Sequence, residues 1–214
     1  MTSFVKSAAL TCAAIAVLSR PAGAAAVFVD NFSFESAAVG DGAVSGTHPG
    51  WTGGSVFNPT ATAVPAVPDG LQVLFLQGGG ATGSATQLLA AVLTAGTTYT
   101  LQVDVGSRLD FNFIGTYVIS LQGTSVVLAS ATSPTPANGS FVTSSLSYVA
   151  GATNLGEALR IRITHTGAGS STGLFDNVRL DASPTAGNPV PEPSALGLAG
   201  LGLAGLAWLR RSRA

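Results

Sequence analysis

The sequence predicts an all-β protein built around one antiparallel β-sandwich, and three observations predict it. First, residues 98–105, 116–122 and 159–164 alternate polar and apolar side chains with a period of two, with Val118 as the one exception. This is the pattern of a strand with one buried face. Second, turn clusters such as Gly78-Gly79-Gly80 and Asn138-Gly139 separate the apolar stretches. Third, no stretch of residues 27–181 shows the 3.6-residue period of an amphipathic helix.

Each element follows from this reading in chain order. Apolar and β-branched runs predict further strands at Val27–Phe34, Leu71–Gln77, Ala85–Leu89, Ser125–Ala129, Phe141–Tyr148 and Leu174–Leu180. Eight or nine short strands in roughly 160 residues fit one sandwich domain better than two. The chain then divides into a leader at 1–26, the sandwich domain at 27–181, a spacer at 182–189 and a C-terminal signal at 190–214.

The N-terminus has the composition of a secretory signal peptide. Lys6 supplies the positive charge, an apolar run extends from Ala8 to Leu18, and small residues follow up to Ala26. Cleavage after Ala24 or Ala26 fits this pattern. The alternative is an uncleaved anchor helix, but the apolar run is too short to span a membrane comfortably. We therefore expect an exported protein.

The C-terminus combines a short motif, an apolar run and a basic end. The motif is Val190-Pro191-Glu192-Pro193, the apolar run spans Ala195 to Leu209, and the chain ends with Arg210, Arg211 and Arg213. A helix of this length, extended by snorkelling arginines, predicts a single transmembrane helix with its basic end in the cytoplasm. A plain tail anchor is the alternative interpretation.

These three parts, in this order, resemble the PEP-CTERM sorting signal, which is also found as the C-terminal domain of certain ice-binding proteins. The resemblance covers about 25 residues. It implies processing by an exosortase-type enzyme, transient anchoring in the inner membrane, and a final location at the cell surface or in the extracellular, biofilm-type matrix.

The composition of the domain excludes some functions. Residues 27–189 contain nine carboxylates and four arginines, a formal charge of −5 (4 − 9), so the domain lacks the basic surface that nucleic-acid binding needs. The one cysteine of the chain, Cys12, lies in the predicted leader. The exported domain is therefore expected to have neither disulfides nor thiolate metal ligands.

Four short motifs carry a second resemblance. Asn31-Phe32-Ser33-Phe34-Glu35 opens the domain, Gly50-Trp51 follows, Thr98-Tyr99-Thr100-Leu101 stands in the middle, and Phe175-Asp176-Asn177-Val178-Arg179-Leu180 closes it. This order resembles galactose-binding-like jelly rolls, including several carbohydrate-binding modules. The resemblance implies that the first and last strands lie together and hold a structural calcium ion between Glu35 and Asp176. The alternative is that both carboxylates accept ordinary turn hydrogen bonds.

Sugar-binding modules stack aromatic rings on sugar rings and hydrogen-bond to the hydroxyls. The expected ligand-binding residues are Trp51, Arg108, Phe111 and Phe113, with Phe57 and Tyr117 as further exposed candidates. For each aromatic ring taken alone, core packing is the favoured interpretation.

Enzymatic function is not expected. The two histidines, His48 and His165, lie in no metal-ligand spacing. Asp104 and Asp110 form a possible carboxylate pair, but the strand position of Asp104 is more typical of a solvated face. We therefore expect a non-catalytic surface or matrix protein that contacts extracellular polysaccharide. The alternatives are a structural or adhesive protein-binding module and, with less support because the threonines have no constant spacing, an ice-binding protein.

Overall fold

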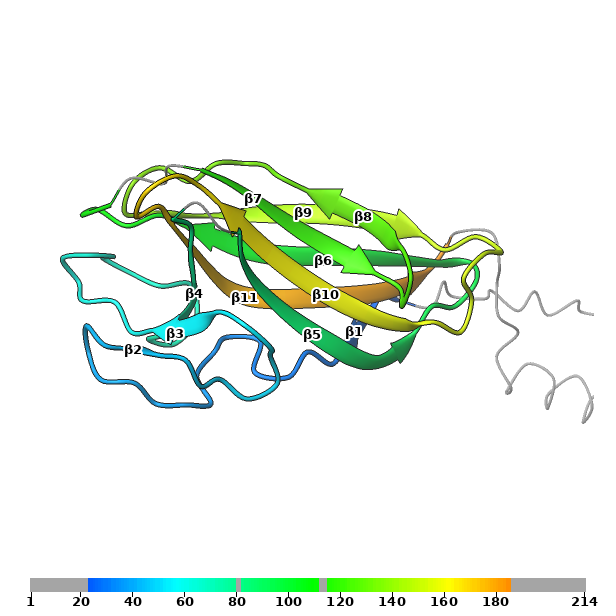
Figure 1. Ribbon diagram of the computed structural model, residues 1–214. Coiled ribbons are helices and arrows are strands. Elements are labelled where there is room, and N and C mark those ends of the chain that lie inside the picture. The colour runs from blue at the N-terminus through cyan, green and yellow to red at the C-terminus, as the bar shows by residue number, and fades with distance from the viewer. Residues whose placement is uncertain (1–22, 80–81, 112–114, 186–214) are drawn as a thin grey trace, which may run out of the picture. The chain divides into compact units, whose positions relative to one another are not determined.

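The structure is a computed structural model that describes residues 23–79, 82–111 and 115–185, which belong to one compact unit. Within these ranges all the regular structure is β-sheet (Figure 1). The strands are β1 (Ala25–Val27), β2 (Val44–Ser45), β3 (Ser55–Phe57), β4 (Val73–Gln77), β5 (Thr82–Val92), β6 (Thr97–Gly106), β7 (Thr116–Gln122), β8 (Val127–Ala131), β9 (Phe141–Val149), β10 (Ala158–Thr166) and β11 (Thr172–Pro184).

Two antiparallel sheets form the predicted sandwich. The larger has the order β2-β3-β4-β11-β6-β9, with β1 also paired to β11, and the smaller has the order β5-β10-β7-β8. When β4 to β11 are counted as eight successive strands, one sheet holds the first, eighth, third and sixth, and the other holds the second, seventh, fourth and fifth. This alternation is the strand order of a jelly roll, so the predicted fold class is confirmed.

The core between the sheets is formed by the alternating apolar residues that were predicted to be buried. Leu101, Val103 and Val105 of β6 are fully buried, as are Ile119 and Leu121 of β7. The same holds for Leu159, Ile161 and Ile163 of β10. Because side chains alternate across a strand, the intervening residues of β6 point to the opposite, outer face of the larger sheet. That outer face carries the candidate site.

The first predicted strand, Val27–Phe34, is wrong over most of its length. β1 ends at Val27, and the chain then turns, with positive φ angles of 46° at Asn31 and 62° at Phe34. The backbone here is bound by side chains instead of a neighbouring strand: Trp51 Nε1 donates to the carbonyl of Asp30 at 3.1 Å, and the Gln87 amide pairs with the same residue.

The C-terminal edge of the domain also differs from the prediction. β11 continues past residue 181 to Pro184, with Ala182 opposite Tyr99 and Pro184 opposite Thr97. The first three residues of the expected spacer are therefore part of the sheet. In the described ranges there is no helix long and apolar enough to cross a membrane. The sorting motif (Val190 to Pro193), the predicted transmembrane helix, the terminal arginines and residues 1–22 of the predicted leader lie outside these ranges. The last residues of the predicted leader are described, and Ala25 and Ala26 belong to β1.

Candidate functional site on the outer face of the larger sheet

Two aspartates lie side by side on the outer face, on the central strands β6 and β11. Asp104 and Asp176 are directly opposite each other in the antiparallel register, so their side chains leave the sheet on the same face. Asp176 is 0% exposed and Asp104 is 7% exposed. Immediately after Asp176 the register shifts, and Asn177 has a positive φ of 50°. This bulge brings the side chain of Asn177 next to Asp104.

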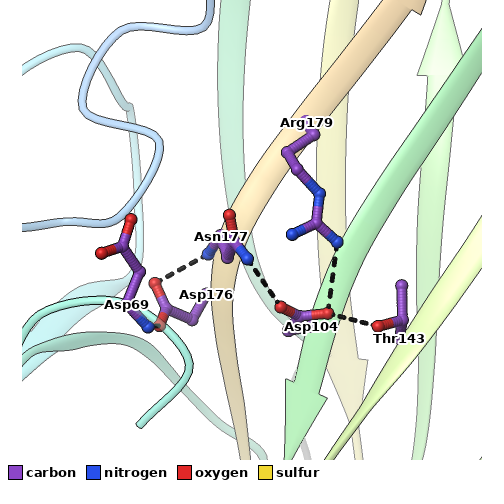
Figure 2. A network of polar contacts seen from close by, with 6 residues as sticks. All are labelled: Asp69, Asp104, Thr143, Asp176, Asn177 and Arg179. Carbon is purple, nitrogen blue, oxygen red and sulfur yellow. Dashed lines mark hydrogen bonds and ion pairs between the residues drawn. The ribbon is translucent and has the colours of Figure 1, made fainter.

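Asp104 is the centre of a hydrogen-bond network (Figure 2). Its Oδ1 accepts a bond from Thr143 Oγ1 at 2.6 Å, and its Oδ2 accepts one from Asn177 Nδ2 at 2.9 Å. The Arg179 guanidinium lies 3.5 Å from Oδ1, with its side chain 38% exposed. A carboxylate, an amide, a hydroxyl and a guanidinium from three neighbouring strands therefore converge at one place.

Asp176 lies beneath this network and is closed off from solvent. Its Oδ2 accepts a bond from the backbone N–H of Asp69 at 2.9 Å, and its Oδ1 accepts one from the N–H of Asn177 at 2.7 Å. Burial raises the pKa of Asp176 to about 8; the two N–H donors lower it, and the charges of Asp69 and Asp104 raise it further. Burial prevails because a desolvated carboxylate loses more than two hydrogen bonds restore.

Glu35 and Asp176 hold the two ends of one loop segment. Glu35 Oε1 accepts bonds from the N–H groups of Leu71 at 2.8 Å and Gln72 at 2.6 Å, while Asp176 binds the N–H of Asp69. Gly70 stands between them with a φ of +70°, and a Cβ there would overlap Glu35 Oε1. The two carboxylates that the sequence analysis paired are therefore connected in the structure, because both accept N–H bonds from the backbone of residues 69–72.

This geometry fits the predicted calcium ion only in part. In the described part of the chain, no group of three or more acidic, histidine or cysteine residues is placed to hold a metal ion. Glu35 and Asp176 alone supply fewer oxygens than the six to eight that calcium prefers, and both already accept N–H bonds. Calcium binding stays a prediction.

A pocket of about 470 Å³ opens beside Asp104. Its lining consists of Pro65, Ala66, Val67, Pro68, Asp104, Gly139, Ser140, Phe141, Val142 and Thr143. One wall is the segment 65–68, just before the residues held by Asp176 and Glu35. Another is the start of β9. The pocket is mostly apolar with a few convergent polar groups, as small-molecule and sugar-sized sites usually are.

A second apolar cluster supports the wall of this pocket. Phe57, Ala63, Val64, Val73 and Leu174 are buried together on the outer side of the sheet, with Val67 and Phe141 packed against them. The N–H of Leu109 also donates to the carbonyl of Ala63 at 2.8 Å. The segment over the sheet is therefore packed and hydrogen-bonded at several points.

The predicted ligand residues have different environments. Trp51 is 7% exposed, packs at 5.3 Å against Phe34 and donates its Nε1–H to Asp30, so it is a core residue and offers no ring to a ligand. Phe57 and Tyr117, at 4% and 1% exposure, are also core residues, so all three rings follow the core-packing interpretation and none is an exposed candidate. Phe113 lies outside the described residues.

Arg108 and Phe111 contact each other, and neither lines the pocket beside Asp104. The Arg108 guanidinium is stacked between the rings of Phe57 and Phe111 at 4.9 and 4.8 Å, and its Nε donates to Asp110 at 2.8 Å. Phe111 is 43% exposed. Since Arg108 is already stacked and ion-paired, its contacts stabilise this loop.

Sequence reasoning missed the residues at the centre of the site. Asp104 was expected on a solvated face, yet it is buried. It also forms no pair with Asp110, because Asp104 binds Asn177 whereas Asp110 binds Arg108. One available signal was the run Asp176-Asn177 inside an otherwise apolar closing strand, because polar residues within such a run are hydrogen-bonded when buried.

A family model described as HpiC1 cyclase matches residues 25–181. The chain belongs to the HpiC1-like family. A second model, the PEP-CTERM protein-sorting motif, matches residues 189–211, which confirms the predicted sorting signal and marks this HpiC1-like protein as exported. No curated protein matches the sequence closely enough to count as a relative.

Solved structures agree with the family assignment. The Stig cyclase FisC from Fischerella sp. TAU, in complex with (3Z)-3-(1-methyl-2-pyrrolidinylidene)-3H-indole, is 25% identical, with 76% of this chain and 99% of that chain covered and a TM-score of 0.66. A cyclase from the same organism with bound 4-(1H-indol-3-yl)butan-2-one is also 25% identical, with 75% and 98% coverage and a TM-score of 0.65. An arabinose-bound α-L-arabinofuranosidase, 16% identical over 73% of this chain and 26% of that chain with a TM-score of 0.53, shares the fold alone.

Proposed function

We propose that this exported HpiC1-like protein contacts extracellular polysaccharide through the pocket beside Asp104, without catalysing a reaction, and that an exosortase-type enzyme processes its tail. The observation that carries the proposal is the convergence of Asp104, Thr143, Asn177 and Arg179 at the edge of an open pocket of about 470 Å³. Sugar hydroxyls both donate and accept hydrogen bonds, and this set offers both functions.

The burial of Asp176 supports a binding role over a catalytic one. A general acid must come within hydrogen-bond reach of the atom it protonates. Asp176 has the raised pKa that suits an acid, but it is 0% exposed and does not line the pocket. Asp104 does line the pocket, and there it is bound to an amide and a hydroxyl.

A second candidate is cyclase activity on an indole-type small molecule. The family model over residues 25–181 and the 25% identity to FisC favour it. In this candidate a ligand would have to displace the segment held by Asp176 to reach that carboxyl. Incubation with 4-(1H-indol-3-yl)butan-2-one, followed by a binding measurement, tests whether the pocket accepts this class of ligand.

The polysaccharide proposal is tested by retention of the full chain on immobilised polysaccharides. The protein is purified in a polyoxyethylene detergent, which has no sugar headgroup. Asp104→Asn and Thr143→Val remove hydrogen-bonding capacity from the pocket with little change in shape, and we expect each to weaken retention at least about tenfold, as the loss of a charge-assisted bond would. Asp41→Asn is the matched control, because it removes an exposed carboxylate outside the pocket. Equal retention of all four proteins would rule out this pocket.

A further inference from the structure

A second pocket of about 440 Å³ lies along β11, on the side of β1. Phe28 and Phe32 line it, and they are 80% and 42% exposed. Asn177, Arg179 and Asp181 of β11 line it as well. Two exposed aromatic rings thus share a hollow with an amide, a guanidinium and a carboxylate.

The segment that carries the two rings is anchored between them, at Asp30 and Asn31. Trp51 Nε1 donates to the carbonyls of Asp30 and Asn31 at 3.1 and 3.3 Å. The amide of Gln87 both donates to and accepts from the backbone of Asp30, at 2.7 and 2.9 Å. The exposure of Phe28 and Phe32 is therefore a feature of a bound segment.

The bulge in β11 supplies a further anchor. After the register shift, the N–H of Val178 donates to the carbonyl of Phe32 at 3.0 Å. The same irregularity that turns Asn177 toward Asp104 therefore binds the aromatic segment beside Arg179. Exposed apolar groups that lie together and are rimmed by polar residues mark binding surfaces, whereas scattered single ones do not.

The two pockets meet at one polar network. Asp104 lines the first pocket, and Asn177 and Arg179 line the second. Asn177 and Arg179 both donate to Asp104, as Figure 2 shows. A ligand that follows the outer face of the sheet across β6 and β11 would pass from one pocket to the other along these side chains.

The charge of this face selects between classes of polysaccharide. Asp104 and Asp181 provide two carboxylates, and Arg179, already next to Asp104, provides one guanidinium. The domain as a whole is acidic, with nine carboxylates against four arginines in residues 27–189. A polymer of uronic acids would be repelled, whereas a neutral chain would not.

We propose that Phe28 and Phe32 form the aromatic platform of a second subsite, on which a ring of a neutral polysaccharide stacks while Asn177, Arg179 and Asp181 bond to its hydroxyls, so that one chain spans both pockets. This inference rests on the polysaccharide contact proposed for the first pocket. It adds the ligand class, the platform residues and a preference for longer chains, because two linked contacts bind more tightly than one.

The test compares retention of the full chain on a neutral galactan, a neutral β-glucan and alginate. Phe28→Ala and Phe32→Ala remove the platform, and Leu88→Ala is the matched control, since Leu88 is 62% exposed on β5 of the other sheet. We expect about a tenfold loss of retention on at least one neutral polymer for each platform variant, none for Leu88→Ala, and little binding to alginate.

The outcomes separate this inference from the proposed function. Loss of retention in Asp104→Asn with full retention in Phe28→Ala would overturn the second subsite and leave the first pocket standing. Loss in Phe28→Ala with full retention in Asp104→Asn would refute the first pocket and overturn the inference that one chain spans both, leaving Phe28 in a separate contact. Retention on alginate above that on the neutral polymers, or Phe28-dependent binding to phosphatidylcholine vesicles without polysaccharide binding, would overturn the inference.

Discussion

The pH dependence of stability provides a sharp test of the buried carboxyl at the base of the site. The perturbation is Asp176→Asn, compared with the parent protein between about pH 5 and about pH 8. Burial raises the pKa of Asp176 to about 8, whereas an aspartate in an unfolded chain titrates near 3.9. Between these two values the folded protein keeps a proton that the unfolded chain releases.

The sign and size of the effect follow from proton linkage. The stabilisation is fully present below the unfolded pKa and is lost as the pH rises through the folded pKa, because the unfolded state then binds fewer protons than the native state. With the folded pKa near 8, the parent should lose roughly 3–4 kcal/mol of unfolding free energy across this range. For a domain of this size that corresponds to a Tm decrease of roughly 10 °C.

Urea unfolding at closely spaced pH values measures this difference. Burial lowers the pKa of His165, and this group opposes the trend below about pH 6.5, but it is present in both proteins and cancels in the comparison. Asp110→Asn is the control, since the hydrogen bond from Arg108 lowers the pKa of Asp110 and its linkage lies below the window. Parallel curves for the parent and Asp176→Asn would refute the reasoning.

Two further predictions concern the loop segment at 69–72. Gly70→Ala should lower the unfolding free energy by about 2–3 kcal/mol in urea, because the new Cβ would overlap Glu35 at a φ of +70°, while Gly156→Ala, at a φ of +80° with open space around it, should lose only about 1 kcal/mol; equal losses would contradict the contact with Glu35. If calcium binds at Glu35 and Asp176, the Tm should be higher in calcium than in EDTA and the difference should vanish in Glu35→Gln; the same Tm in both solutions would exclude the ion.

The fold could be predicted from the sequence where one face of a strand is buried. In β6, β7 and β10 the alternation of apolar and polar residues follows directly from the alternation of side chains across a sheet, and residues such as Val103, Ile119 and Ile161 lie in the core as expected. The strand predicted at residues 27–34 was wrong over most of its length because the backbone there is bound by the side chains of Trp51 and Gln87. Contacts between residues so distant along the chain leave no local pattern.

The site could be predicted only in outline. The closing motif drew attention to Asp176, but nothing local to Asp104 shows that it lies opposite Asp176, since strand register is a property of the whole sheet. The aromatic candidates failed for a related reason. The sequence around an aromatic residue such as Trp51 is the same whether the ring faces a ligand or the core. Its ring is buried because it packs against Phe34, which is distant in sequence.

The position of β11 in the sheet has a mechanical consequence. This strand is bonded to β6 on one side and to β4 and β1 on the other, and the residues that lead to the sorting tail continue directly from its end. A pull between the tail and a polymer held on the outer face would load β11 along its length. Its ladder of bonds to β6 would then carry the force together, in shear, instead of opening one after another. The tail therefore leaves the domain from a strand that is hydrogen-bonded on both sides.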